Sequence, residues 1–110
     1  LLVHQSQEDL HKKEVFFIKE VITRGYPIIK QGQTNQNLYL IQSGKVALYC
    51  KHPKDNNEAF LYLKTLKTGQ MFNFNCVNSA SSPFLIEAYS PEVKVYKVQM
   101  EQLINNFDST

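Results

Sequence analysis

The chain has 110 residues, of which 43% are hydrophobic and 20% are charged, and its formal net charge is +2. This length limits the chain to one domain, and its apolar content excludes a disordered protein. The weak, scattered charge is not the footprint of a nucleic-acid partner, and the absence of a long apolar run predicts no membrane contact from this segment.

Cysteine usage indicates the cellular compartment. The two cysteines, Cys50 and Cys76, are too few for a disulfide framework, and no signal peptide is recognisable. We therefore expect an intracellular, cytoplasmic protein. Because the chain begins at Leu1 rather than Met, we also expect it to be a piece of a longer polypeptide.

The first predicted elements are a short helix and two strands. Ser6 is a suitable N-cap, with Asp9 three residues later, for a helix over residues 6–13. Residues 15–23 are rich in β-branched and aromatic side chains, and residues 27–30 form a brief strand that starts at a proline.

Glycines then mark the turns between short strands. Strands are predicted over residues 37–42 and 45–50, and the Ser43-Gly44 link between them predicts a β-hairpin. Glycine reaches positive φ without steric cost, and all four glycines occupy turn positions: Gly25, Gly32, Gly44 and Gly69.

The second half continues in the same way and ends in a helix. A polar loop at 52–58 and a small-residue loop at 78–83 separate strands at 60–66, 84–88 and 93–98, and apolar residues at i, i+3, i+4 and i+7 predict a helix over 100–107. About eight strands with short flanking helices predict a mainly β fold, a jelly-roll-like β-roll or double-stranded β-helix. We expect three parts: a helical segment at 1–14, the roll at 15–99 and the start of a C-terminal helix at 100–110.

The glycine spacing resembles that of the cyclic nucleotide-binding domain, over residues 15–107. The matching positions are Gly25, Ile28-Ile29, Gly32, Leu38-Tyr39-Leu40-Ile41, Gly44 and Val46, followed by Gly69, Phe72 and Ile86-Glu87-Ala88. The resemblance implies a non-catalytic regulatory β-roll, as found in regulatory subunits of cyclic-AMP-dependent kinase, in gated channels and in transcription regulators of the catabolite-activator type.

The residues that capture the nucleotide depart from the family pattern. In the family, Phe-Gly-Glu opens a phosphate-binding cassette, the Glu accepts the ribose 2′-hydroxyl, and an Arg near the end pairs with the cyclic phosphate. This chain has Phe72, Asn73 and Phe74 at the first motif and Ser82 at the Arg position, and no Lys or Arg occurs from residue 68 to 93.

These departures predict a degenerate ligand site. Loss of the cation costs about 3–5 kcal/mol, and loss of the charged hydrogen bond to the ribose costs about 1.5–3 kcal/mol. We expect the Phe74 ring to fill the sugar site. The candidate ligand-binding residues of this degenerate cassette are Phe72, Asn73, Phe74, Asn75, Cys76, Ser81 and Ser82.

Two functions remain open at this point. The favoured one is a regulatory or scaffolding module without a cofactor, which contacts a protein partner or other domains of the same polypeptide. The alternative is a functional cAMP- or cGMP-binding domain of a kinase or ion channel, in which backbone amides of residues 73–76 and the Ser82 hydroxyl hold the phosphate. Backbone N–H groups at the start of a short cassette helix, helped by Ser79, Ser81 and Ser82, could also hold another anion. The alternative is that residues 78–83 are simply a loop.

Enzymatic readings have less support. The histidines lack the spacing of a cupin-like metal site, and Cys76 has no His nearby to act as its base, which favours a buried small hydrophobe. No catalytic residue and no metal ligand is predicted. Phe72, Phe74 and Phe84 line an aromatic pocket or, as we favour, belong to the core.

Overall fold

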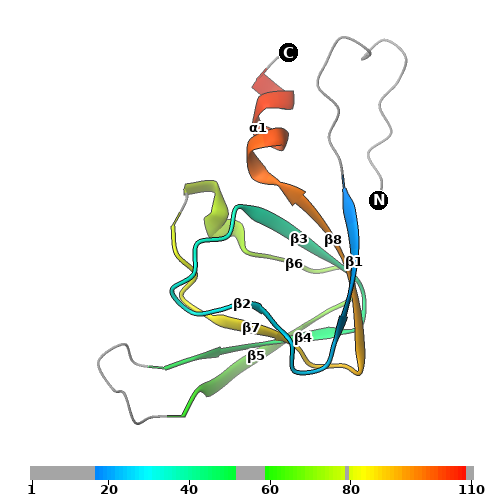
Figure 1. The fold of residues 1–110 in the computed structure, drawn as a ribbon, viewed down its shortest axis with the longest axis vertical. Coiled ribbons are helices and arrows are strands. Elements are labelled where there is room, and N and C mark those ends of the chain that lie inside the picture. Colours follow the sequence, from blue (N-terminus) through cyan, green and yellow to red (C-terminus); the bar gives the residue numbers. More distant parts are fainter. Residues whose placement is uncertain (1–16, 52–58, 79, 109–110) are drawn as a thin grey trace.

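The computed structural model describes residues 17–51, 59–78 and 80–108, which form two antiparallel sheets and a short helix (Figure 1). The first sheet, sheet A, has the order β1 (Ile18–Thr23), β8 (Glu92–Gln99), β3 (Asn37–Ser43) and β6 (Met71–Phe72). Sheet B has the order β2 (Pro27–Ile29), β7 (Leu85–Ala88), β4 (Lys45–Cys50) and β5 (Leu61–Lys67). A 3-10 helix, η2 (Phe74–Asn78), connects β6 towards β7, and α1 (Met100–Asp108) follows β8.

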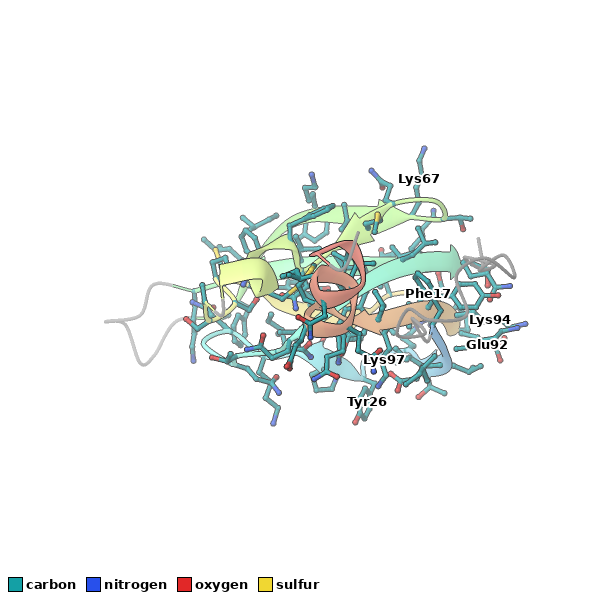
Figure 2. All side chains as sticks on the ribbon, turned by 90° about the horizontal axis from the view of Figure 1, so that it is seen from above. Phe17, Tyr26, Lys67, Glu92, Lys94 and Lys97 are labelled. Carbon is teal, nitrogen blue, oxygen red and sulfur yellow. The ribbon has the colours of Figure 1, made fainter. Side chains whose placement is uncertain are left out.

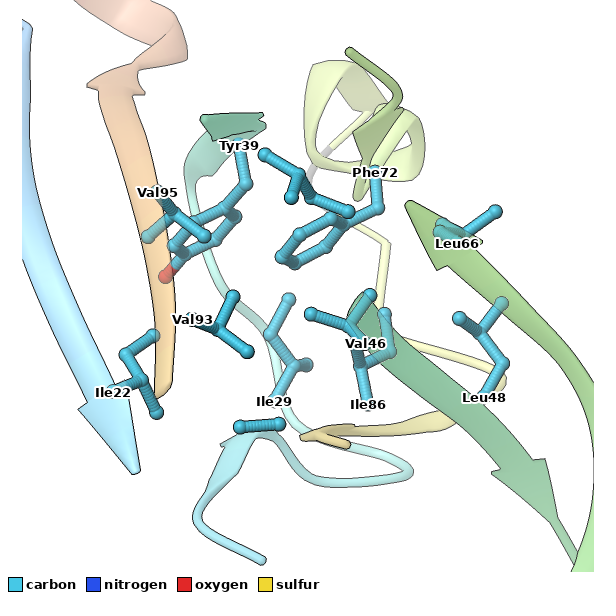
Figure 3. Close-up of a cluster of buried hydrophobic side chains, with 12 residues drawn as sticks. Ile22, Ile29, Tyr39, Val46, Leu48, Leu66, Phe72, Ile86, Val93 and Val95 are labelled. Carbon is cyan, nitrogen blue, oxygen red and sulfur yellow. The ribbon is translucent and has the colours of Figure 1, made fainter. Parts of the chain in front are cut away.

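The core lies between the two sheets because alternate residues of the strands face inward. In β8, Val93 and Val95 are fully buried, while the intervening Lys94 is only partly covered. Each buried aliphatic side chain contributes about 1.5–3 kcal/mol. Figure 3 shows the resulting cluster, formed by Ile22, Ile29, Tyr39, Ile41, Val46, Leu48, Leu66, Phe72, Ile86, Ala88, Val93 and Val95.

A corner at Gly44, and not a hairpin, joins β3 to β4. The hairpin prediction is wrong, because β3 pairs with β8 and β6, whereas β4 pairs with β5 and β7. A register shift between Ile41 and Ser43 precedes the corner, and Gly44 has a φ of 96°. The chain thus bends from one sheet into the other, which lets both sheets close on one core.

A second, smaller cluster fixes the helices at one end of sheet A. It contains Leu38, Cys76, Val98 and Met100, with Phe17 and Leu103 packed against it. The Met100 backbone N–H also donates to the Gln36 carbonyl at 2.9 Å. Both η2 and the start of α1 are therefore anchored to β3 and β8.

The predicted fold class is confirmed, since the described residues form eight strands in two sheets. The C-terminal helix is confirmed from residue 100, while the helix expected at 6–13 and the loop at 52–58 lie outside the described residues. The division at residues 14 and 99 stays a prediction. Among the described residues, no helix combines the length and hydropathy needed to cross a membrane.

Candidate functional site

The cassette, residues 72–82, begins with an aromatic stack inside the roll. Phe72 is only 3% exposed, and its ring lies parallel to that of Tyr39, with the ring centroids 4.8 Å apart (Figure 3). Phe84, at the other end of the connection, packs against the same core. Phe72 and Phe84 are therefore structural residues, in line with the prediction that these rings belong to the core.

Asn73 ties the start of the cassette to the beginning of β3. It has a φ of 73°, the left-handed conformation that glycine adopts without cost and that Asn tolerates better than most residues. Its buried side-chain amide donates to the backbone carbonyls of Asn35, at 2.9 Å, and of Asn37, at 2.8 Å. Both N–H donors are thus used inside the protein.

The prediction that the Phe74 ring belongs to the core is wrong, whereas the expectation that it fills the sugar site stays a prediction. Its ring is 61% exposed, whereas Cys76, two residues later, is 1% exposed. A 3-10 helix has three residues per turn, so side chains two positions apart point to different sides. Burial of Cys76 against Leu38 and Met100 therefore turns Phe74 outward. Burial also raises the pKa of the Cys76 thiol, which stays protonated at neutral pH.

The loop after η2 is closed by its own hydrogen bonds. The Asn75 side-chain amide donates to the carbonyls of Ala80, at 3.3 Å, and Ser81, at 3.2 Å. Ser81 also forms an isolated antiparallel bridge with Thr34. The bridge between Ser81 and Thr34 therefore attaches the cassette loop to the connection between β2 and β3.

Ser82, predicted to lie at the position of the family's arginine, is 3% exposed. Its hydroxyl donates to the Phe84 carbonyl at 2.8 Å and accepts from the Phe84 N–H at 3.2 Å. Its backbone N–H donates to the Gln33 carbonyl, and its own carbonyl accepts from the Gly32 N–H. The single hydroxyl donor of Ser82 is therefore already used.

The chain's single arginine, Arg24, lies outside the cassette, at the turn between β1 and β2. Its Nε donates to the Tyr89 carbonyl at 3.2 Å. Within residues 72–82, the side chains the structure describes carry no charge at neutral pH. The described cassette offers hydrogen-bonding groups but no cation.

Asn35 is a site residue that sequence reasoning missed. Its side chain accepts from the Asn37 N–H at 2.8 Å and donates to the Tyr39 hydroxyl at 3.1 Å, so one residue links the amide network to the aromatic stack. The only sequence signal is local, because Asn side chains commonly bond to the backbone two residues onward.

The two-sheet fold and the cassette between β6 and β7 define the class of β-roll domains. The family model for the cyclic nucleotide-binding domain matches residues 19–109. The chain belongs to the cyclic nucleotide-binding domain family. A comparison with curated proteins found no match.

Solved structures share this fold at low sequence identity. The Thermus thermophilus catabolite activator protein is 23% identical, with a TM-score of 0.73, and the match covers 84% of this chain and 42% of that one. The regulatory domain of Toxoplasma gondii PKA, solved with cAMP, is 17% identical, with a TM-score of 0.72 and coverage of 84% and 35%. This chain therefore spans less than half of either protein.

A third neighbour is the regulatory subunit of a cAMP-independent protein kinase A from Trypanosoma brucei, in a mutant form bound to cAMP in the A site. It is 17% identical, with a TM-score of 0.67, and the match covers 84% of this chain and 35% of that one. At such identities the likeness shows the fold alone.

Proposed function

We propose that this domain is a non-catalytic regulatory or scaffolding module that does not bind cAMP or cGMP in the family's usual way. Its partners are another protein or other domains of the same intracellular, cytoplasmic polypeptide. The observation that carries the proposal is Ser82. The side chain at the cation position is neutral, buried and fully hydrogen-bonded to Phe84.

The energetic argument follows from the charge of the ligand. A cyclic phosphate that leaves water must recover its solvation from a cation, and a buried charge left unpaired costs about 3–5 kcal/mol. To bind phosphate, Ser82 must also break its bond to Phe84, and Asn73 must release the carbonyls of Asn35 and Asn37. A ligand of micromolar affinity would weaken to the millimolar range or beyond.

The cAMP-independent kinase of Trypanosoma brucei supports this proposal at the level of the fold. That protein's description pairs a regulatory subunit with independence from cAMP. A roll of this fold thus occurs in a regulatory protein whose kinase does not depend on cAMP. We infer that this chain likewise has a regulatory role that does not require a cyclic nucleotide.

Calorimetric titration with cAMP and with cGMP tests the proposal directly. We expect no binding heat and no shift of the melting temperature at millimolar nucleotide. AMP, which has an open phosphate, serves as the control for non-specific ionic effects. A dissociation constant in the low micromolar range for either cyclic nucleotide would overturn the proposal.

One feature favours the alternative function, a cyclic nucleotide site with unusual contacts. Lys64 of β5 lies opposite Leu48 in the register and two residues from the buried Leu66, so it occupies the core-facing side of its strand. Lys64 is nevertheless an exposed residue, so its long side chain is free to turn towards a ligand at the rim of the roll. If cAMP binds, Lys64→Gln should abolish the binding while Lys67→Gln, on the other face, preserves it.

A further inference from the structure

Strand β5 exposes an unusual run of apolar residues. Phe60, Leu61, Tyr62 and Leu63 are 39%, 63%, 57% and 44% exposed, although all four are large and consecutive. A folded domain seldom leaves such a run in water unless the surface has a function. Later in the strand, Leu66 is buried in the core, so the exposure belongs to its first half.

The same strand forms the outer edge of sheet B. Within residues 17–51, 59–78 and 80–108, β5 pairs with β4 alone and is the last strand in the sheet order, at the bottom of Figure 1. An edge strand presents backbone N–H and C=O groups that no neighbouring strand uses, and these can pair with an added strand.

Among the described residues, basic side chains outnumber acidic ones around this edge. No Asp or Glu occurs in residues 21–51 or 59–86, and Glu87 is the only acid of sheet B. Lys45 and Lys67 lie directly opposite each other in the register, a like-charge pair that is unfavourable without an acid nearby. In Figure 2, Lys67 stands on the edge formed by β5, apart from Glu92 on β8.

A hollow adjoins the start of the apolar run. It has a volume of about 630 Å³ and is lined by Phe60, Lys51, Lys30, Leu85 and Glu87, among others. The Lys51 ammonium lies 5.0 Å from the centre of the Phe60 ring. Apolar surface and positive charge are therefore combined where β5 begins as well as along the strand.

We propose that the outer edge of β5 docks an extended, acidic segment of a protein partner, which adds a strand to sheet B. The inference rests on the proposed function as a protein-docking module. Main-chain hydrogen bonds give such a complex its affinity, and alternate side chains give its specificity. Acidic side chains of the partner meet Lys64 and Lys67, and apolar ones cover Leu61 and Leu63.

Lysines can also protect an edge strand from association. Protection of this kind does not explain why residues 60–63 are exposed, because this stretch contains neither a charged residue nor a proline that would discourage strand pairing. The two lysines of β5 both follow the apolar run, at positions 64 and 67. Because the apolar residues precede the lysines in β5, the partner strand can bind in one orientation only. Its apolar half lies over residues 60–63 and its acidic half over residues 64–67.

The test uses a fluorescent peptide as long as β5, with one half made of Val and the other half of Glu, and the matched peptide with Lys in place of Glu. We expect the acidic peptide to bind at least about tenfold tighter, and salt to weaken it. Methylation of alternate backbone nitrogens in the acidic peptide should abolish binding. Equal binding of the methylated peptide would overturn strand addition.

Charge-reversed variants localise the contact. Lys64→Glu with Lys67→Glu should weaken the acidic peptide about tenfold or more, whereas Lys19→Glu with Lys94→Glu changes the net charge equally on sheet A and should leave affinity within about twofold. Equal losses in both variants would mean general attraction and overturn the proposal. If the first variant unfolds, Leu61→Thr with Leu63→Thr takes its place and should weaken binding similarly.

Competing ligands complete the test. Tighter binding to phosphatidylserine vesicles or to single-stranded DNA than to the acidic peptide would overturn the proposal in favour of a membrane or a nucleic acid. Absence of peptide binding overturns this proposal alone. The cAMP titration judges the proposed function separately, because it measures nucleotide binding in the absence of any peptide.

Discussion

The side-chain amide of Asn73 donates to the backbone carbonyl of Asn37 at 2.8 Å, across a gap of 36 positions in the sequence. This bond joins the first residue after β6 to the first residue of β3. A second bond, to the Asn35 carbonyl, uses the other proton of the same amide. The cassette thus begins at a residue whose side chain serves the fold.

Substitutions at Asn73 should separate its side chain from its backbone conformation. Asn73→Ala loses both hydrogen bonds and leaves Ala at a φ of 73°, which Ala tolerates less well than Asn, so we expect a loss of about 2–4 kcal/mol in the free energy of unfolding. Asn73→Gly loses the same bonds without the strain and should cost about 1–2 kcal/mol less than Ala. Urea unfolding measures both, and equal losses would contradict the role of the backbone.

The corner at Gly44 should tolerate no side chain. A Cβ there would lie 2.7 Å from the Glu92 carbonyl oxygen, and the φ is 96°. We expect Gly44→Ala to destabilise the domain by about 3 kcal/mol or more, because steric overlap adds to backbone strain. Gly69→Ala is the control, since Gly69 has a similar φ of 90° but open space around it. The Gly69→Ala variant should lose only about 1–2 kcal/mol of unfolding free energy. A similar loss in both variants would disprove the steric overlap at Gly44.

The two thiols should react at different rates. Cys76 is 1% exposed and burial raises the pKa of its thiol, whereas Cys50 is only partly buried. Because the thiolate is the reactive form, an aromatic disulfide reagent should modify the Cys76→Ser variant, which retains Cys50, much faster than Cys50→Ser. Because burial raises the pKa of the Cys76 thiol, its modification should need a pH above the ordinary thiol range. Faster modification of Cys76 would mean that η2 opens readily.

Restoring the family's two missing groups should restore some ligand binding. We expect Phe74→Glu with Ser82→Arg to bind cAMP weakly in calorimetry, and Phe74→Glu alone to remain silent, because the cation supplies most of the phosphate affinity. Ser82 is buried, so circular dichroism must first verify that the double variant is folded. A folded double variant that ignores cAMP would mean that the pocket has diverged beyond these positions.

Much of the architecture could be predicted from spacing. Strand 45–50 has the expected bounds, and the other predicted strands among the described residues match to within about three residues, which is the usual uncertainty at element ends. The hairpin at Ser43-Gly44 failed because the same two residues suit a tight turn and a corner between sheets. Local sequence does not distinguish the two, since the choice depends on the pairing of β3 with β8 and of β4 with β7.

The candidate site was harder to predict. Composition alone identified the missing charges, but the orientation of Phe74 depends on Cys76, whose burial requires Leu38 and Met100 from distant segments. The bonds of Asn73 and Ser82 also reach residues that have no motif of their own. Such contacts follow from tertiary packing, which a single sequence does not display.

Amide, hydroxyl and backbone groups make the hydrogen bonds that hold the described part of residues 73–82 in place. Neutral contacts of this kind respond little to ionic strength or to mild acid and alkali. We therefore expect changes in ionic strength to leave the conformation of this segment unchanged. We therefore propose that a signal reaches this domain through contact with a protein partner or a neighbouring domain.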